Sequence, residues 1–193
     1  KCDFGVPEDK AQENFTDPDS RIMKRAGGGF DPGYNAQTAV DEAAHIIVAA
    51  ELTHNASDAG QLPGVLQAVH ENVGQRPRQA LADAGYRSEQ TFRDLEGCGT
   101  ELVVALGREG KRQLSFDRQR NPHTAQMADK LDSEAGKAAY RRRKWIAEPP
   151  NGWIKNVLGF RQFSMRGLER VKAEWKLVCM ALNLRRMCSL SAG

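Results

Sequence analysis

The chain has 193 residues, 40% of them apolar, and carries a formal net charge of +3. This length and composition suffice for one folded domain with a sizeable core. No apolar run approaches the roughly 20 residues that cross a bilayer, and no secretory signal is present, so a membrane protein and a secreted protein are disfavoured. The four cysteines lack the paired spacing of zinc sites, which indicates reduced thiols in the cytoplasm.

The first third of the chain predicts an irregular lead-in followed by a hairpin. Residues 1–33 are rich in glycine and proline and have no periodic pattern, apart from a short edge strand at 21–23. Two strand-like segments, 34–40 and 45–52, predict an antiparallel hairpin. We therefore expect the folded domain to span residues 34–193.

Helices and strands alternate after the hairpin. Residues 55–58 supply capping residues for a helix over 60–73, which apolar residues at spacings of three and four predict. A short apolar strand then ends at Asp83. A helix over 89–96, a buried strand over 102–106 and a polar loop over 107–121 follow. An antiparallel start followed by alternating strands and helices predicts an α/β fold, a mixed sheet flanked by helices.

The last third is predicted to be helical with one interruption. Helices are expected over 124–131 and 134–144, the second ending in a basic cluster. Proline fits best in the first turn of a helix, so a new helix is expected to start near Pro149, with Glu148 at or beside its N-cap. The last helix, over 167–187, has one apolar stripe that indicates core packing.

The charge is divided unevenly along the chain. Residues 140–193 contain twelve Lys and Arg against three Glu, a net +9, so the remainder carries −6 of the total of +3. Such asymmetry favours a polyanionic partner for the basic part. The alternative is a solvated helix surface without a partner.

Two carboxylates stand at positions suited to metal chemistry. Asp83 ends a buried strand, where α/β sheets place their ligands, although an Asp in such a turn is also satisfied by nearby backbone N–H groups. Phosphoryl transfer on nucleic acids commonly uses two divalent ions roughly 4 Å apart, and carboxylate oxygens suit Mg²⁺ or Mn²⁺. Lys155 falls nearly on the helical face of Glu148, where a cation can hold a DNA phosphate.

Several blocks of the chain resemble bacterial insertion-sequence transposases of the DDE class. They occur in the expected order and together cover nearly the whole chain. The blocks are FTDPDSRIM at 15–23, GYNAQTAVD at 33–41, ADAGY at 82–86, EPPNGWIK at 148–155 and GFRQF at 159–163.

The resemblance implies a ribonuclease-H-like catalytic domain that cuts and joins DNA with Mg²⁺ or Mn²⁺. Asp83 is then the second catalytic Asp and Glu148 the catalytic Glu, both binding metal. The cations expected to contact DNA are Arg143, Lys144, Lys155 and Arg161. The partners implied are transposon ends and target DNA, with a homo-oligomer on the DNA, in the bacterial cytoplasm at the nucleoid.

The chain departs from the family pattern in two places. Related members share Tyr-x2-Arg-x3-Glu-x6-Lys, in which Lys155 fits, Lys144 takes the Arg position and Tyr140 lies one residue too far upstream. The first catalytic Asp of relatives lies in an Asp-Gly-Thr strand that this chain lacks, so the first strand of the fold is expected to be missing. Asp19 and Asp41 are the weak fallback candidates for that carboxylate.

These departures leave other functions open. The chain starts at Lys1 rather than Met, which suggests a fragment or a processed piece. Without the Asp-Gly-Thr strand it resembles the C-terminal part of a transposase, which is expected to be inactive by itself. One alternative is a non-catalytic DNA-binding remnant of a truncated transposase. Another is a nuclease of the same fold that acts by hydrolysis alone.

Overall fold

The computed structural model describes residues 13–24, 28–107 and 115–192. Its strands form three separate two-stranded pairs, β1 with β2, β3 with β4 and β5 with β6. The strands are β1 (Arg21–Lys24), β2 (Phe30–Gly33), β3 (Asn35–Val40), β4 (Ile47–Thr53), β5 (Gln79–Ala82) and β6 (Glu101–Val104). The helices are α1 (Leu62–Val73), α2 (Glu89–Asp94), α3 (Pro122–Asp132), α4 (Glu134–Asn156) and α5 (Leu168–Ser191).

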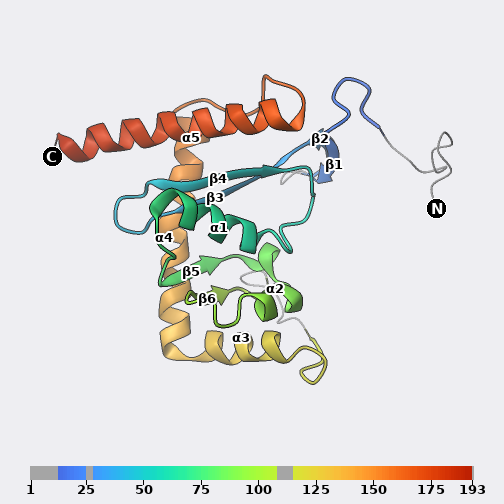
Figure 1. Cartoon of the computed structure of the whole chain (residues 1–193), viewed down its shortest axis with the longest axis vertical. Coiled ribbons are helices and arrows are strands. Elements are labelled where there is room, and N and C mark those ends of the chain that lie inside the picture. The colour runs from blue at the N-terminus through green and yellow to red at the C-terminus, as the bar shows by residue number, and fades with distance from the viewer. Residues whose placement is uncertain (1–12, 25–27, 108–114, 193) are drawn as a thin grey trace.

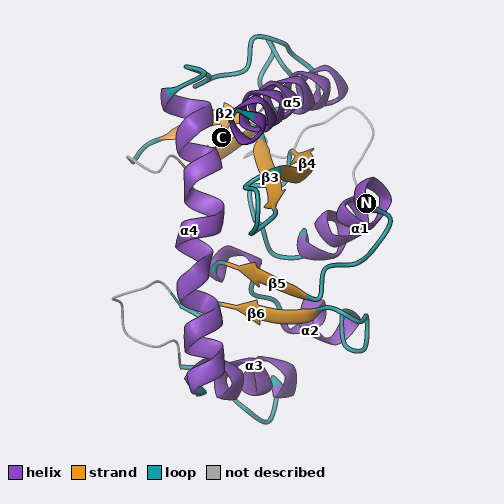
Figure 2. Ribbon diagram, turned by 90° about the vertical axis from the view of Figure 1, so that its left-hand side faces the viewer, coloured by secondary structure: helices purple, strands orange, loops and turns teal. Residues whose placement is uncertain are grey.

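The strands lie between two layers of helices. The long helix α4 runs behind the β3–β4 and β5–β6 pairs in Figure 1, from α3 at one end of the molecule to α5 at the other. Figure 2, turned by 90°, shows α4 on one side of these strands and α1 and α2 on the other. The mixed α/β architecture predicted from the alternating elements is confirmed.

The strand pairing follows the predicted order of elements. The hairpin is present, with β3 and β4 antiparallel from Asn35 opposite Thr53 to Val40 opposite Ile47. Strands β5 and β6 are parallel and are joined through α2. Hydrogen bonds do not join these two pairs into one sheet within the described residues.

The predicted lead-in contains more regular structure than expected. The edge strand at residues 21–23 is confirmed as β1, and it pairs with β2, which the sequence did not predict. The sequence of β2 did not indicate a strand, because it contains glycine and proline and both residues are depleted in strands. Residues 1–12 lie outside the described part of the chain.

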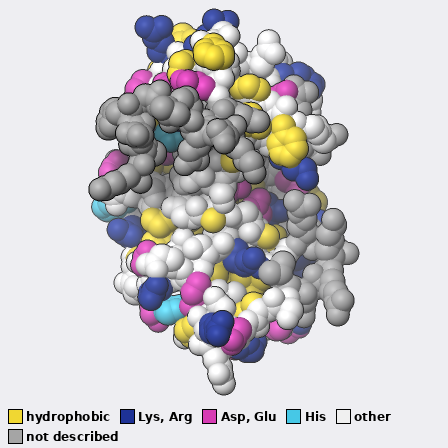
Figure 3. Space-filling view, turned by 90° about the vertical axis from the view of Figure 1, so that its right-hand side faces the viewer, with side chains coloured by type: hydrophobic (Ala, Val, Ile, Leu, Met, Phe, Trp, Pro, Cys, Tyr) yellow, Lys and Arg dark blue, Asp and Glu magenta, His cyan; other side chains and the backbone are white. Residues whose placement is uncertain are grey.

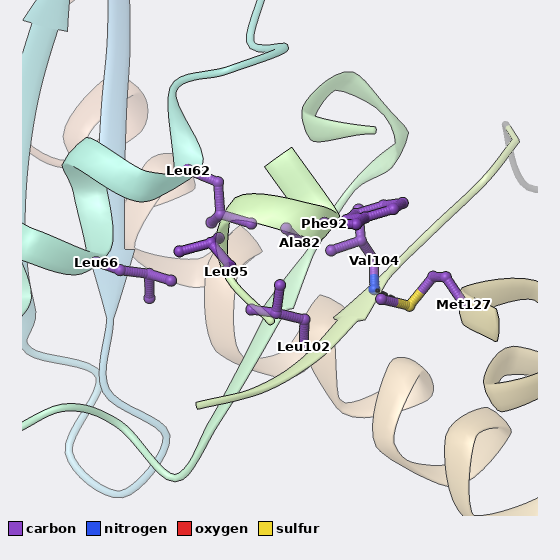
Figure 4. Close-up of a cluster of buried hydrophobic side chains, with 8 residues drawn as sticks. All are labelled: Leu62, Leu66, Ala82, Phe92, Leu95, Leu102, Val104 and Met127. Atoms are coloured by element: carbon purple, nitrogen blue, oxygen red, sulfur yellow. Dashed lines mark hydrogen bonds between the residues drawn. The ribbon is translucent and has the colours of Figure 1, made fainter. Parts of the chain in front are cut away.

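One core cluster surrounds the parallel pair. Leu102 and Val104 of β6 and Ala82 of β5 pack against Phe92 and Met127 (Figure 4). The Met127 sulfur accepts the Val104 N–H at 3.4 Å. This apolar packing on both faces explains why β5 and β6 read as short continuous apolar runs rather than as alternating strands.

A second cluster holds the hairpin against α5. Val171, Trp175 and Leu182 of the predicted stripe are buried against Ile47 and Leu52 of β4. The side chain of Asn183 also bonds both the N–H and the carbonyl of Ile47, at 2.8 Å each. The stripe on α5 is therefore core, as its spacing predicted.

The interruption predicted at Glu148 and Pro149 is wrong. Helix α4 continues through Pro149 and Pro150 to Asn156, so Glu148 lies inside the helix and not at its N-cap. Pro149 has no N–H to bond the carbonyl four residues earlier, that of Trp145. The ring Nε2 of His45, from the β3–β4 turn, bonds that carbonyl at 2.8 Å. A tertiary contact thus compensates for the bond that proline removes.

Candidate active site

Asp83 lies directly after the carboxyl end of β5. Its backbone is extended, and its Oδ1 accepts the N–H of Gly85 at 2.8 Å, which caps the short 3₁₀ helix Ala84–Tyr86. The side chain is exposed. The two interpretations made from the sequence are therefore compatible, because one oxygen serves the turn while the carboxylate still faces solvent at the edge where α/β sheets bind ligands.

A second carboxylate, that of Asp58, adjoins the same turn. A Cβ atom added at Gly85 would lie 2.5 Å from Asp58 Oδ2 and 3.0 Å from Asp83 Oδ1, so the two carboxylates converge on Gly85. The side chains of Asn35 and Gln37 hold Asp58 Oδ1 at 2.6 and 2.7 Å. The sequence indicated only a helix-capping role for residues 55–58. Asp58 was missed because its partners come from β3, about 20 residues earlier.

Tyr86 completes this polar cluster. Its hydroxyl donates to Oε1 of Gln37, the residue whose amide nitrogen holds Asp58. Burial raises the pKa of Tyr86, and the negative charges of Asp58 and Asp83 raise it further. The phenol therefore stays neutral and remains a hydrogen-bond donor at physiological pH.

Glu148 lies on an exposed face of α4. Because α4 is continuous, Lys144 and Lys155 stand one turn before and two turns after Glu148 on nearly the same face. All three side chains are exposed. The predicted shared face of Glu148 and Lys155 is thus present, although it arises from an unbroken helix and not from a new one.

Helix α4 brings Glu148 to the region of β5 without a direct contact to Asp83. Leu81 and Ala147 line one cavity between β5 and α4, and the two acidic residues follow closely after them in the chain. No group of three or more His, Cys, Asp or Glu residues that could hold a metal ion occurs among the described residues. The pairing of Asp83 with Glu148 at one ion remains a prediction.

The other predicted residues lie in different surroundings. Arg143 is about 140° around α4 from Glu148, lines that cavity and holds its Cζ 5.5 Å from the ring centre of Tyr140. Arg161 is exposed and bonds Asn156 Oδ1 at 3.2 Å. Asp19 accepts the Leu168 N–H at the start of α5, and Asp41 accepts the N–H groups of Ala43 and Ala44 in its own turn. Both fallback carboxylates thus have structural partners within the fold.

The molecular face seen in Figure 3 carries basic and acidic side chains intermixed over its visible part. By contrast, α4 and α5 contain most of the cations of the basic C-terminal part.

No described helix is long and apolar enough to cross a membrane.

The chain is similar to a known protein family. The family described as Transposase DDE domain matches residues 6–184, nearly the whole chain. The chain belongs to the transposase DDE domain family. No curated protein and no solved structure matches it. Bacterial insertion-sequence origin, expected from the resemblance, remains a prediction.

Transposases of this class generally use divalent metal ions, and the chemistry of the donors at Gly85 is suited to them. Both groups are carboxylates with hard oxygen atoms, and Asp83 Oδ2 and Asp58 Oδ2 have no hydrogen-bond partner among the described residues. Mg²⁺ is commonly bound through one or two carboxylates plus water and substrate phosphate. The donor chemistry of Asp83, with Asp58 beside it, fits such an ion, and metal binding by these two residues stays a prediction.

Replacing Gly85 by alanine tests this convergence. The added Cβ must displace the Asp58 carboxylate, which two amides hold, and it crowds Asp83 as well. We expect divalent-ion binding to weaken by about tenfold or more, while the free energy of unfolding changes by about 1 kcal/mol or less, because Gly85 and Asp83 are exposed and the half-buried Asp58 lies outside both core clusters. Calorimetric Mg²⁺ or Mn²⁺ titration and urea unfolding measure the two effects.

Gly64→Ala is the matched control for this substitution. Gly64 lies inside α1 with open space around it, so alanine there should stabilise the protein by about 0.5–1 kcal/mol and leave metal binding unchanged. Unchanged ion affinity in Gly85→Ala would show that the two carboxylates do not act together.

Proposed function

We propose that this transposase domain catalyses divalent-metal-dependent DNA strand cleavage and strand transfer, with Asp83 and Glu148 as its catalytic carboxylates. The assignment as a transposase is based on the family match. The observation that supports the residue assignment is the exposed Asp83 at the carboxyl end of a parallel strand, with α4 packed beside that strand.

The roles of the side chains follow from their charge and placement. Asp83 and Glu148 would hold Mg²⁺ or Mn²⁺, which when bound supplies the positive charge that activates an attacking hydroxyl and stabilises the leaving oxygen. Lys144 and Lys155 flank Glu148 on α4 and would hold phosphates of the DNA strand on either side of it. Tyr86, kept neutral, would hold the Asp58 and Asp83 turn in place through Gln37.

The reaction sequence consists of two in-line displacements. Water first attacks a phosphodiester at the transposon end and releases a 3′-hydroxyl. That hydroxyl then attacks a phosphodiester of target DNA, forms a new bond to its phosphorus and releases the target 3′-hydroxyl as the leaving group. Both steps develop charge on phosphate oxygens, so positioning and electrostatic stabilisation by these carboxylate-bound ions and lysines would supply most of the catalysis.

A ribonuclease-H-like sheet is part of this proposal. The antiparallel β3–β4 pair and the parallel β5–β6 pair lie in one layer between α4 and the helices α1 and α2 (Figure 2). That layering is the arrangement expected of a mixed sheet covered on both faces. We further propose DNA as the partner of the basic C-terminal part, with a homo-oligomer forming on the DNA.

The decisive experiment incubates the full-length protein with labelled DNA carrying its transposon ends, with and without Mg²⁺ or Mn²⁺. Metal-dependent nicking together with strand-transfer products supports the proposal. Hydrolysis without strand transfer would identify a nuclease instead. Salt-sensitive DNA binding without nicking would identify the non-catalytic remnant, because phosphate contacts alone make affinity fall with salt.

A further inference from the structure

Helix α4 has a weak point beside Glu148. Pro149 and Pro150 follow it inside the helix, and Pro149 has no N–H to donate to the carbonyl of Trp145. Sharp helix kinks, of more than about 20°, occur mostly at such prolines. Lys155 lies two turns, about 10 Å, beyond Glu148, so a kink of that size between them would displace it by about 3–4 Å. A kink here would therefore separate the residues of the proposed site.

His45 contacts α4 on both sides of these prolines. Before them, its ring Nε2 bonds the carbonyl of Trp145 at 2.8 Å. A carbonyl only accepts hydrogen bonds, so Nε2 carries the hydrogen and donates it. After them, its ring meets the ring of Trp153 edge-on, with the ring centres 6.2 Å apart. One side chain thus spans the prolines and contacts both halves of the helix.

The turn between β3 and β4, which contains His45, is itself fixed. Asp41 accepts the N–H groups of Ala43 and Ala44 at 2.9 Å each. The carbonyl of Ala44 accepts a hydrogen bond from Nε of Arg186 on α5 at 2.8 Å. His45 has a φ of 56°, a left-handed conformation that histidine adopts more readily than most residues. The turn lies against α4 and α5 (Figure 1), so it holds the imidazole ring in a set place.

A second contact joins this turn to α4 but does not cross the prolines. Arg142 bonds both carboxylate oxygens of Glu42, at 2.8 and 2.9 Å. Both side chains are exposed, and exposed ion pairs contribute little. The ring of His45 is half-buried, and its Nδ1 is buried without a hydrogen-bond partner among the described residues. The bond from its Nε2 is therefore the contact of this turn that supports the helix at Pro149.

We propose that His45 is a positioning residue for DNA strand cleavage. It holds α4 together across Pro149 and so fixes Glu148 relative to Lys155. It acts through the helix and not on the reacting atoms. A displacement of about 1 Å in a reacting centre can cost about a hundredfold in rate, so loss of this contact should lower the cleavage rate more than the affinity for DNA. This role rests on the proposed catalytic function of Glu148.

Replacing His45 by asparagine tests the contact while it preserves the turn. Asparagine also adopts left-handed φ values, but its amide nitrogen lies one bond closer to the backbone than Nε2 does. In the full-length transposase, the single-turnover cleavage rate at saturating DNA should fall by about tenfold or more, and the Kd for DNA should change by about twofold or less. His45→Gln, whose amide nitrogen reaches as far as Nε2, should recover most of the rate. His54→Asn, an exposed change directly after β4, should cleave normally.

Pro149→Ala is the matched second variant. Alanine supplies the N–H that proline lacks, so the carbonyl of Trp145 no longer needs His45. In the Pro149→Ala background, His45→Asn should change the cleavage rate by about twofold or less. Hydrogen exchange followed by mass spectrometry gives a readout that is independent of catalysis. The amides of residues 151–156 should exchange faster in His45→Asn and should return to the wild-type rate in the double variant.

The outcomes separate this inference from the proposed function. Normal cleavage by Glu148→Gln would remove the catalytic role of Glu148. If Glu148→Gln is inactive, normal cleavage by His45→Asn would overturn the positioning role alone. An equal loss of rate from His45→Asn with and without Pro149 would also overturn it, because His45 would then act independently of the helix. A fall in DNA affinity as large as the fall in rate would indicate a folding defect and would overturn it as well.

Discussion

Replacing Asp83 by asparagine or Glu148 by glutamine in the full-length transposase is expected to abolish DNA strand cleavage and to leave DNA binding intact. Each change keeps the shape of the side chain and removes the negative charge that the proposed ion requires. We expect cleavage to fall by at least about a hundredfold to a thousandfold, as when one charge-stabilising group is lost from a reacting centre. A gel assay of nicked and joined products measures the loss.

Matched controls separate this loss from a folding defect. Glu134→Gln changes an exposed carboxylate on the same helix as Glu148, and Asp94→Asn changes an exposed one at the end of α2. Both should cleave normally. Cleavage that survives in Asp83→Asn or Glu148→Gln would remove that residue from the active site. Loss of DNA affinity in the same variants would indicate a structural role instead.

Replacing Glu174 by glutamine should produce a large loss of stability. Glu174 is buried on α5, where its carboxylate accepts the Ser164 and Met165 N–H groups at 2.9 and 3.0 Å and the Ser164 hydroxyl at 2.5 Å. These bonds fix the loop between α4 and α5, which contains Arg161. Glutamine carries no charge, and its NH₂ group replaces one of the oxygen atoms that accept these hydrogen bonds. The free energy of unfolding should therefore fall by about 2–3 kcal/mol.

The same carboxylate predicts a pH dependence. Burial alone would raise the pKa of Glu174, but the hydrogen bonds from Ser164 and Met165 lower it below the ordinary glutamate value. The unfolded chain therefore binds the proton more readily than the folded one. The stability from Glu174 is fully present above the ordinary value near 4.5 and is lost as pH falls through the lower folded pKa.

Urea unfolding at pH 7, 5 and 3 tests both effects. The difference in the free energy of unfolding between wild type and Glu174→Gln should be largest at pH 7 and should become smaller at pH 3. Glu169→Gln, an exposed change in the first turn of α5, should have a much smaller effect. Equal midpoints for wild type and Glu174→Gln at pH 7 would contradict the prediction.

Much of the fold could be predicted because its signals are local. The alternation in the hairpin, the spacing in α1 and α5 and the turn after Asp83 each depend on residues close together in sequence. Strand β2 could not be predicted, since glycine and proline carry no strand signal and only pairing with β1 defines it. The same locality explains why the position of Asp83 at the end of β5 was predictable.

The error at Pro149 has a different origin. Sequence rules treat proline as a helix breaker because it removes one backbone bond. Here His45, 100 residues away, bonds the carbonyl that Pro149 leaves free. That contact keeps Lys144, Glu148 and Lys155 on one unbroken helix. No property of the residues around Pro149 could have shown it.

Apart from the helix break expected at Pro149, the order and kind of the elements after the lead-in could be predicted from the residues alone, as could the resemblance to DDE transposases and the position of Asp83, because periodicity and motifs are properties of short segments. The folded structure was needed to show that Asp58 joins Asp83 at Gly85, that α4 is continuous and that β3 and β5 line opposite sides of a cavity. These features require contacts between residues far apart in the chain. Such contacts form only when the strand pairs and helices pack into layers.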